Sequence, residues 1–199
     1  MANTFIVADD HPICSSMITL AIRSRWDDAE IKTVTSLGAL LGLLDDECTK
    51  LLILDLNLDD SSGLRTLAMV RGHHPDVPVL VFSANANDEL IRGARALGAD
   101  GILSKELTRE DLALAIQTIS EGRGLAQPID MRDDVPRIPA GPLRVLPLLL
   151  EGLSNQGIAD KLGLTQDTIK KHVATVLKAL GVKSRGQAII KLQSGGNPE

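Results

Sequence analysis

Residues 51–60 read LLILDLNLDD, and this stretch decides how the first part of the chain folds. The apolar residues 51–54 run directly into the carboxylate of Asp55, after which the chain turns polar. A short, uniformly apolar run is typical of a strand buried on both faces of a parallel sheet. In open sheets of this kind, functional sites form at the carboxyl ends of the strands. The position of Asp55 therefore predicts a site at that edge.

The same pattern, an apolar run followed by a stretch with helical spacing, recurs over residues 1–121. The other apolar runs are Thr4–Ala8, Ile31–Val34, Val77–Phe82 and Gly101–Leu103. The helical stretches are Ile13–Arg25, Leu37–Leu44, Gly63–Arg71, Asp88–Leu97 and Arg109–Glu121. Five such β–α units predict an α/β domain in which helices cover a parallel sheet.

A second part of different character follows. Residues 122–141 are rich in Pro, Gly and Asp, which neither extend a helix nor pair as a central strand, and we interpret them as a linker. Residues 142–199 show only helical periodicity and predict a small all-α domain. Residues 1–125 carry 11 Lys and Arg against 19 Asp and Glu, whereas residues 126–199 carry 10 against 7. An acidic first part and a basic second part indicate two domains with different partners.

Composition excludes several classes of protein. Hydrophobic residues make up 44% of the chain and aromatic residues only 2%, so the core must be aliphatic. The two cysteines, Cys14 and Cys48, have neither disulfide nor metal-ligand spacing, which is typical of reduced thiols in the cytosol. No stretch approaches the ~20 apolar residues of a membrane span, and charged residues interrupt the first apolar run. We expect a cytoplasmic protein without membrane contact.

Polar side chains follow four of the predicted strands. Asp9 and Asp10 follow the first strand, Asp55 the third, Ser83 the fourth and Lys105 the fifth. Three carboxylates in one pocket repel one another, and a hard cation such as Mg²⁺ relieves that repulsion. A carboxylate nucleophile beside a metal, a cation and a hydroxyl fits phosphoryl transfer to Asp55. Any one Asp after a strand is also common as a turn or cap residue, so the inference depends on the set.

Four motifs carry a resemblance to a known family. They are FIVADDHP (5–12), LLILDLNL (51–58), VLVFSA (79–84) and DGILSKE (100–106). With them, residues 4–121 resemble the receiver domain of a two-component response regulator. The resemblance implies a flavodoxin-like (βα)5 fold, in which Asp55 accepts a phosphoryl group from a sensor histidine kinase.

The resemblance also implies roles for the neighbouring residues. Asp10, Asp55 and the backbone carbonyl of Asn57 would bind Mg²⁺, and Asp9 would act mainly through water. The two side chains that would contact the phosphoryl oxygens are Ser83 and Lys105.

Three positions in this part need separate interpretation. The family usually has proline four residues after the acceptor, where this chain has Asp59 followed by Asp60. The added charge either repels phosphate or faces solvent. Ile102 stands where the family usually has an aromatic ring that couples to the hydroxyl residue, which predicts weaker or different coupling. We interpret His11 as a loop residue rather than a second phosphoacceptor.

Residues 152–164, GLSNQGIADKLGL, begin a predicted helix-turn-helix. Ser154 or Asn155 can cap the first helix, and Gly163 turns the chain. Thr165 can cap a second helix from Gln166 to about Leu180. The predicted exposed face of the second helix carries Gln166, Lys170, Lys171, Ala174 and Lys178. Such a face is either simply solvated or, in a helix-turn-helix, contacts DNA phosphates and guanine edges.

A second resemblance favours DNA. Residues 152–190 are closely similar, and residues 138–193 loosely similar, to the LuxR/NarL-type DNA-binding domain. The likeness implies that Lys170 and Lys171 lie near bases of double-stranded DNA, and that Thr168 and His172 lie near the sugar–phosphate backbone. We add His172, Lys178, Lys183 and Arg185 as candidate backbone contacts. The helix from Ser184 to about Leu192 would support a homodimer.

Departures from this second family cluster in the segment IPAGPLRVLPLLLEG (138–152). Gly141 and Pro142 replace an Arg–Glu pair, and Pro147 falls where the family's helix runs on. A proline inside a helix costs ~3 kcal/mol, so we predict a kinked, delayed or missing helix start. Gly157 replaces a glutamate, and Ala174 replaces a polar contact. The DNA-binding domain is therefore predicted to be marginal, or to need dimerisation or DNA to settle.

Together the two domains indicate a NarL/FixJ-type response regulator, not a metabolic enzyme. In this interpretation phosphorylation of Asp55 controls dimerisation and sequence-specific DNA binding, and the oppositely charged domains make an autoinhibitory contact. One alternative is a signalling adaptor with a degenerate helix-turn-helix, suggested by Pro147, Gly141 and Gly157. Another is a DNA binder independent of phosphorylation, suggested by Asp59 and Ile102.

Overall fold

The computed structural model describes residues 4–46, 48–84, 87–122 and 136–194. Its first part is a five-stranded sheet in the order β2-β1-β3-β4-β5, with every neighbouring pair parallel. The strands are β1 (Thr4–Ala8), β2 (Glu30–Val34), β3 (Thr49–Leu54), β4 (Val79–Ser83) and β5 (Gly101–Ser104). The helices are α1 (Pro12–Arg23), α2 (Leu37–Asp46), α3 (Leu64–His73), α4 (Asp88–Ala96) and α5 (Arg109–Ser120). The predicted parallel sheet with alternating helices is confirmed.

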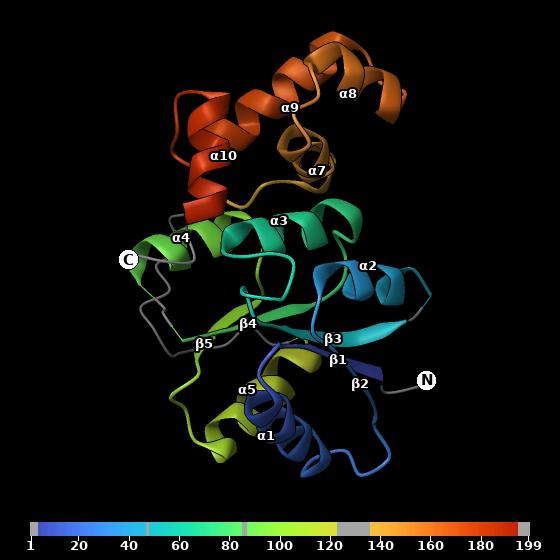
Figure 1. The fold of residues 1–199 in the computed structure, drawn as a ribbon, viewed down its shortest axis with the longest axis vertical. Coiled ribbons are helices and arrows are strands. Elements are labelled where there is room, and N and C mark those ends of the chain that lie inside the picture. The colour runs from blue at the N-terminus through green and yellow to red at the C-terminus, as the bar shows by residue number, and fades with distance from the viewer. Residues whose placement is uncertain (1–3, 47, 85–86, 123–135, 195–199) are drawn as a thin grey trace.

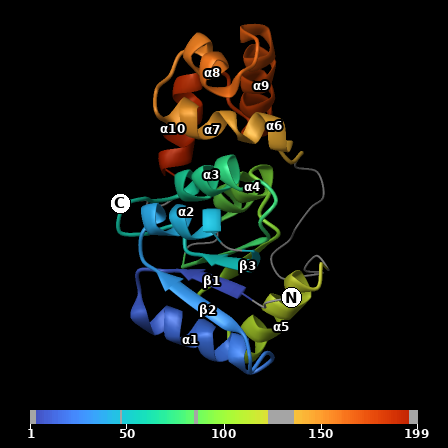
Figure 2. The same cartoon turned by 90° about the vertical axis from the view of Figure 1, so that its right-hand side faces the viewer.

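The apolar run of β3 is continuous because both faces of the strand are covered. Leu52 and Leu54 belong to the core shared with α2, α3 and α4, whereas Leu51 and Ile53 belong to the core shared with α1 and α5. Successive side chains of a strand point to opposite faces, so each layer takes every second residue. Figures 1 and 2 show α1 and α5 on one face of the sheet and α2, α3 and α4 on the other.

The strand order also places the acidic residues. From β1 the chain continues to β2 on one side, and then crosses to β3 on the other side of β1. The direction in which strands are added to the sheet therefore reverses between β1 and β3. Ligand crevices of open α/β sheets form at such a reversal, outside the carboxyl ends of the strands. Asp9 and Asp10 follow β1 and Asp55 follows β3, which brings all three to that point.

The second part of the chain is helical. Its helices are α6 (Ala140–Leu143), α7 (Val145–Leu150), α8 (Asn155–Leu162), α9 (Gln166–Ala179) and α10 (Arg185–Ser194). Val145, Leu149, Ile158 and Ile169 form a small separate core. The helices begin two residues inside the predicted linker, of which residues 123–135 lie outside the described part of the chain. None of the described helices is both long and apolar enough to cross a membrane.

The interruption predicted from Pro147 is confirmed. Arg144 forms a turn between α6 and α7, and Pro147 is the third residue of the restarted helix. Amide groups in the first turn of a helix have no acceptor within the helix, so proline there loses no hydrogen bond. The restart therefore avoids the penalty of a proline deep inside a helix.

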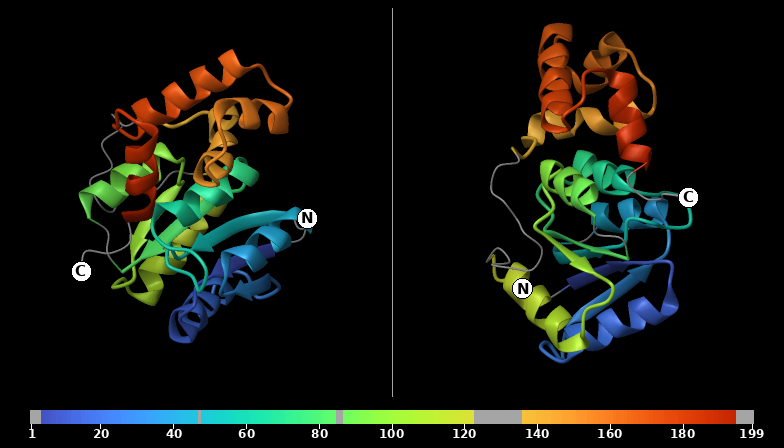
Figure 3. Two further views of the ribbon diagram at one scale, coloured as in Figure 1. Left: turned by 45° about the horizontal axis from the view of Figure 1, so that its top comes forward. Right: turned by 90° about the vertical axis from the view of Figure 1, so that its left-hand side faces the viewer.

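The helical part packs on α3 of the first part (Figures 1 and 3). A Cβ atom added at Gly72 of α3 would lie 2.3 Å from Pro147 Cδ and 3.1 Å from the carbonyl oxygen of Leu143. Only glycine permits this approach. Ala188 and Leu192 of α10 are buried in the same apolar cluster as the residues of α3.

Polar contacts border this seam. The Ile138 amide donates a hydrogen bond to the carbonyl of Ala96 at 2.8 Å. The Arg137 guanidinium lies 3.6 Å from a carboxylate oxygen of Asp100. The seam is thus an apolar contact with polar contacts beside it. In these polar contacts, Arg137 and Ile138 bind to the end of α4 and to the residue before β5.

Candidate functional site

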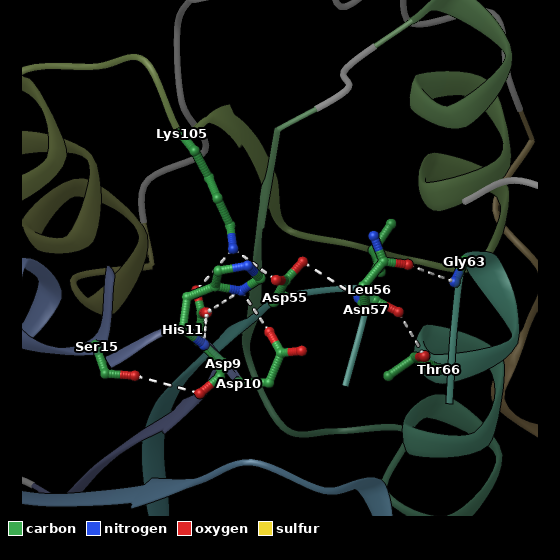
Figure 4. A network of polar contacts seen from close by, with 10 residues as sticks. All are labelled: Asp9, Asp10, His11, Ser15, Asp55, Leu56, Asn57, Gly63, Thr66 and Lys105. Atoms are coloured by element: carbon green, nitrogen blue, oxygen red, sulfur yellow. Dashed lines mark hydrogen bonds and ion pairs between the residues drawn. The ribbon is translucent and has the colours of Figure 1, made fainter. Parts of the chain in front are cut away.

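The carboxylates predicted to converge do converge, at the ends of β1 and β3 (Figure 4). The Asp55 amide donates to the carbonyl of Ala8 at 2.8 Å, which joins the ends of the two strands. Carboxylate oxygens of Asp9, Asp10 and Asp55 all lie within 4.8 Å of one another, together with a ring nitrogen of His11. Asp9 and Asp55 are only 2% and 3% exposed. Three acidic groups therefore share one largely buried pocket.

Lys105 provides the positive charge of this pocket. Its Nζ lies 2.5 Å from Asp55 Oδ2 and 2.9 Å from Asp9 Oδ2, and its backbone amide donates to the carbonyl of Ser83 at 3.0 Å. Burial lowers the pKa of Lys105, but its hydrogen bond to Asp55 and the negative charges of Asp55 and Asp9 outweigh that effect and hold the pKa above its ordinary value. Lys105 is therefore a permanent cation beside Asp55.

Burial also changes the chemistry of Asp55. It raises the pKa of this carboxyl above its ordinary value, and the hydrogen bonds from Lys105 and from the Asn57 amide oppose the rise only in part. The negative charge of Asp9 adds to the rise. A poorly solvated carboxylate of this kind is a suitable nucleophile for an electrophilic phosphorus atom.

The donor set fits a hard divalent cation. Asp9 Oδ2 and Asp10 Oδ1 are buried oxygens without a hydrogen-bond partner. Lys105 Nζ and His11 Nδ1 lie within ion-pair distance of them, at 2.9 and 2.5 Å, but without hydrogen-bond geometry. These oxygens keep lone pairs that a cation can take, and carboxylates with a backbone carbonyl are ligands that Mg²⁺ accepts. The acidic cluster is thus typical of a Mg²⁺ site.

The loop after β3 is tied down beside these carboxylates. The Asn57 amide donates to Asp55 Oδ1 at 3.2 Å, and the Asn57 side-chain oxygen accepts from the Gly63 amide at 3.3 Å. The Thr66 hydroxyl, on α3, donates to the carbonyl of Leu56 at 2.7 Å. Thr66 was not predictable from the sequence, because nothing in an apolar helix pattern marks one hydroxyl as the anchor of a loop ten residues earlier.

Ser83 and Ile102 occupy the neighbouring strands. Ser83 ends β4 and is 5% exposed. The register pairs Leu54 with Val81, so Ser83 lies at the same edge of the sheet as Asp55. Ile102 pairs with Val81 and is buried in the apolar layer of α3 and α4. An aliphatic side chain fills this position without a ring.

The predicted helix-turn-helix is present as α8 and α9. The Ser154 side chain caps α8 by accepting from the Gly157 amide, and Gly163 ends α8 in the left-handed region with φ +65°. The Thr165 side chain caps α9 by accepting from the Thr168 amide. The amide of Gly157, in the first turn of α8, is the one that Ser154 caps. The helix α8 therefore forms although glycine stands at this position.

The residues of α9 that we predicted to contact DNA differ in exposure. Lys170, Lys171 and Lys178 are exposed, as predicted for a surface that meets DNA. Thr168 is half-buried. His172 is also half-buried, and its ring lies 3.6 Å from where a Cβ on Gly141 would be. A Cβ atom at position 141 would make only an ordinary van der Waals contact with this ring, so His172 packs beside α6 without depending on the glycine.

Arg185 has partners inside the helical part. Its guanidinium donates to the carbonyls of Leu149 at 2.8 Å and Leu153 at 2.5 Å. These carbonyls lie at the end of α7 and in the turn that follows it, so Arg185 fixes the start of α10 to α7. Lys183 remains exposed at the turn before α10.

Two family models match the chain. The model described as "Response regulator receiver domain" matches residues 5–117, and the model described as "Bacterial regulatory proteins, luxR family" matches residues 143–192. The boundaries of both matches agree with the sheet-containing and helical parts.

Several curated proteins are similar over almost their whole length. The "Glycerol metabolism activator" of Pseudomonas putida is 28% identical over 204 residues, covering 93% of this chain and 92% of the relative. The "Nitrate/nitrite response regulator protein NarL" of Escherichia coli (strain K12) is 28% identical, covering 94% and 93%. The "DNA-binding transcriptional activator DevR/DosR" of Mycobacterium tuberculosis is 25% identical, covering 96% and 93%.

Solved structures show the same fold. A structure of RcsB from Salmonella typhimurium aligns with a TM-score of 0.58 at 23% identity, covering 96% of this chain and 98% of that one. The "two-component response regulator RcsB-DNA complex" aligns with a TM-score of 0.59 at 23% identity, covering 98% and 99%. A CheY-like receiver domain from Methanospirillum hungatei aligns with 61% of this chain at a TM-score of 0.56 and 18% identity, and 96% of that chain is covered.

Proposed function

The chain belongs to the response regulator transcription factors that join a receiver domain to a LuxR-type DNA-binding domain, and from this premise we propose that Asp55 accepts a phosphoryl group from a sensor histidine kinase. One observation carries the proposal. The Asp55 carboxylate is buried, bonded to Lys105 Nζ and flanked by Asp9 and Asp10. This set supplies a nucleophile and the charges that phosphoryl transfer needs.

In the proposed step an oxygen of Asp55 attacks the phosphorus atom of a phosphohistidine. A phosphorus–oxygen bond forms and the phosphorus–nitrogen bond breaks, and the imidazole nitrogen keeps the electron pair and then takes a proton from water. Lys105, which already faces Asp55 Oδ2, donates to the phosphoryl oxygens. The Ser83 hydroxyl donates to a further phosphoryl oxygen and so makes β4 sensitive to phosphorylation.

Asp10, Asp55 and the carbonyl of Asn57 would hold Mg²⁺, and Asp9 would act through a water molecule. When bound, the cation neutralises charge on the phosphoryl oxygens. Without it, three carboxylates and a phosphoryl group would repel one another in a pocket where Lys105 supplies one positive charge. We therefore expect phosphorylation to require a divalent cation.

We further propose that phosphorylation acts through the seam between the two domains. Ala188 and Leu192 of α10 are buried against α3, and Lys191 Nζ lies 3.6 Å from Glu89 of α4. The seam thus holds α10, the helix we assign to dimerisation, against the first domain (Figure 1). The lysines of α9 stay exposed. The centre of the seam is apolar, so attraction between the oppositely charged domains stabilises the contact only at its rim. Release of α10 would allow a homodimer to bind paired DNA half-sites.

Two observations bear on the alternatives. Both helices of the helix-turn-helix are capped and α9 spans Gln166–Ala179 without interruption, which favours DNA binding over an adaptor role. The exposure of Lys170 and Lys171 in the unmodified chain favours some DNA binding before phosphorylation. Phosphorylation would then raise DNA affinity through dimerisation instead of uncovering a hidden α9.

The test uses the full chain with MgCl₂ and acetyl phosphate as the phosphodonor. Intact mass spectrometry measures phosphorylation, and a gel shift at low salt measures DNA binding with and without the donor. The proposal expects one phosphoryl group on the wild type, none on Asp55→Asn, and tighter DNA binding only where the group is present. DNA affinity that is the same with and without the donor would favour the phosphorylation-independent binder, and no binding in either state would favour the adaptor.

A further inference from the structure

The loop between β3 and α3 has a second anchor, on the side opposite to α3. Asp60 Oδ1 accepts a hydrogen bond from the Leu37 amide at 2.6 Å, and Asp60 Oδ2 accepts one from the Gly38 amide at 3.0 Å. Both amides belong to the first turn of α2. Backbone amides at a helix start lack partners within the helix and favour a carboxylate, so this contact is a stable one.

The residue before Asp60 adds a backbone link. The Asp59 amide donates to the carbonyl of Thr35 at 3.0 Å. Proline, the usual residue of the family at this position, has no amide hydrogen and could not form this bond. The Asp59 side chain itself is exposed, which agrees with the solvent-facing interpretation of its charge.

These contacts reach the other half of the acidic pocket. Thr35 directly follows β2, whose last residue, Val34, accepts a hydrogen bond from the Asp9 amide at 3.1 Å. The chain from Val34 to Leu37 is therefore bonded to Asp9 at one end and to Asp60 at the other. It joins the segment that carries Asp9 to the loop that carries the carbonyl of Asn57.

We propose that Asp60, with the Asp59 amide, is a positioning element for the cation site. It fixes the distance between the Asn57 carbonyl and the carboxylates that follow β1, and thereby sets the affinity for Mg²⁺. The inference rests on the proposed function only in taking the pocket as a divalent-cation site. A role limited to capping α2 would stabilise the fold without changing Mg²⁺ affinity.

The test titrates the full chain with MgCl₂ by isothermal calorimetry, without phosphodonor. Asp60→Ala removes both hydrogen bonds and should weaken Mg²⁺ binding by about 3- to 10-fold, in line with the loss of a helix-capping interaction. Asp60→Asn keeps one of the two acceptor oxygens, and should weaken Mg²⁺ binding less than Asp60→Ala does. Thermal melting without Mg²⁺ confirms that each variant is folded.

Asp59→Ala is the matched control, because it removes the same charge one residue away and keeps the backbone amide. It should leave Mg²⁺ affinity within about twofold of wild type, since an exposed charge is screened. Equal weakening by Asp59→Ala and Asp60→Ala would mean that charge alone matters, and wild-type affinity in Asp60→Ala would mean that Asp60 only caps α2. Either result overturns the inference and leaves the proposed function standing. A wild type that binds no Mg²⁺ would overturn both.

Discussion

The two domains hold their functional side chains in opposite ways. In the receiver domain the candidate groups come from separate strands, are buried and bond to one another, as Asp55, Asp9 and Lys105 do. In the DNA-binding domain they lie along one helix, and Lys170 and Lys171 are exposed. Buried charges interact strongly and depend on every partner, whereas exposed charges are screened and act almost independently. One substitution can therefore disable the first site, whereas the second should lose function by degrees.

The largest expected effect compares two lysines directly. Lys105→Met leaves two buried carboxylates without their cation and should lower the free energy of unfolding by about 2–3 kcal/mol. Lys170→Met removes an exposed ion pair to Asp167 and should cost about 0.5 kcal/mol or less. Urea denaturation of both variants without Mg²⁺ measures the difference. Equal losses would show that burial does not separate the two sites.

The seam between the domains provides the next prediction. Gly72→Ala places a methyl group against Pro147 and should weaken the packing between the domains by about 1–3 kcal/mol. Hydrogen exchange at the amides of α10 should then become faster. Gly42→Ala is the control, because a Cβ there meets nothing within 4 Å. Unchanged exchange of α10 in Gly72→Ala would contradict the assigned seam.

A smaller effect is expected for each lysine that we propose to contact DNA. Lys170→Ala or Lys171→Ala should weaken DNA binding by about 1 kcal/mol. If the lysine neutralises a phosphate, the slope of log affinity against log salt concentration should also become smaller by about 1. Fluorescence anisotropy over a range of salt concentrations measures both quantities. Lys161→Ala, on α8, removes another exposed lysine of the same domain and should change neither. A loss of affinity as large for Lys161 as for Lys170 would mean that net charge, not the surface of α9, determines affinity.

The smallest effect concerns pH. Burial raises the pKa of Asp55 in the folded state, so the folded state holds this proton more tightly than the unfolded state. The stability contributed by Asp55 is then present at acid pH and is lost as the pH rises from the unfolded pKa of about 3.9 through the higher folded value. Asp55→Asn should therefore stabilise the chain at neutral pH, and the gain should shrink toward acid pH. Thermal melts at several pH values test this, and a gain that grows toward acid pH would contradict it.

Some of this arrangement could be predicted from sequence and some could not. The sheet and the convergence of Asp9 and Asp55 were predictable, because continuous apolar runs specify a parallel sheet and such a sheet brings strand ends together. The interruption of the helix near Pro147 was predictable, because proline has no amide hydrogen to donate inside a helix. That the ring of Pro147 packs on Gly72 was not, since nothing local couples two residues in different domains. The same holds for Asp60, whose partners lie 22 and 23 residues earlier in the chain.

The most direct test of the central claim is intact mass spectrometry of the full chain after incubation with MgCl₂ and acetyl phosphate, with size-exclusion chromatography of the same samples. We expect one phosphoryl group on the wild type, none on Asp55→Asn, and an accompanying shift of the wild type from monomer to dimer. A wild type that stays unmodified, or an Asp55→Asn variant that is modified to the same extent, would contradict the assignment of Asp55 as the phosphoacceptor.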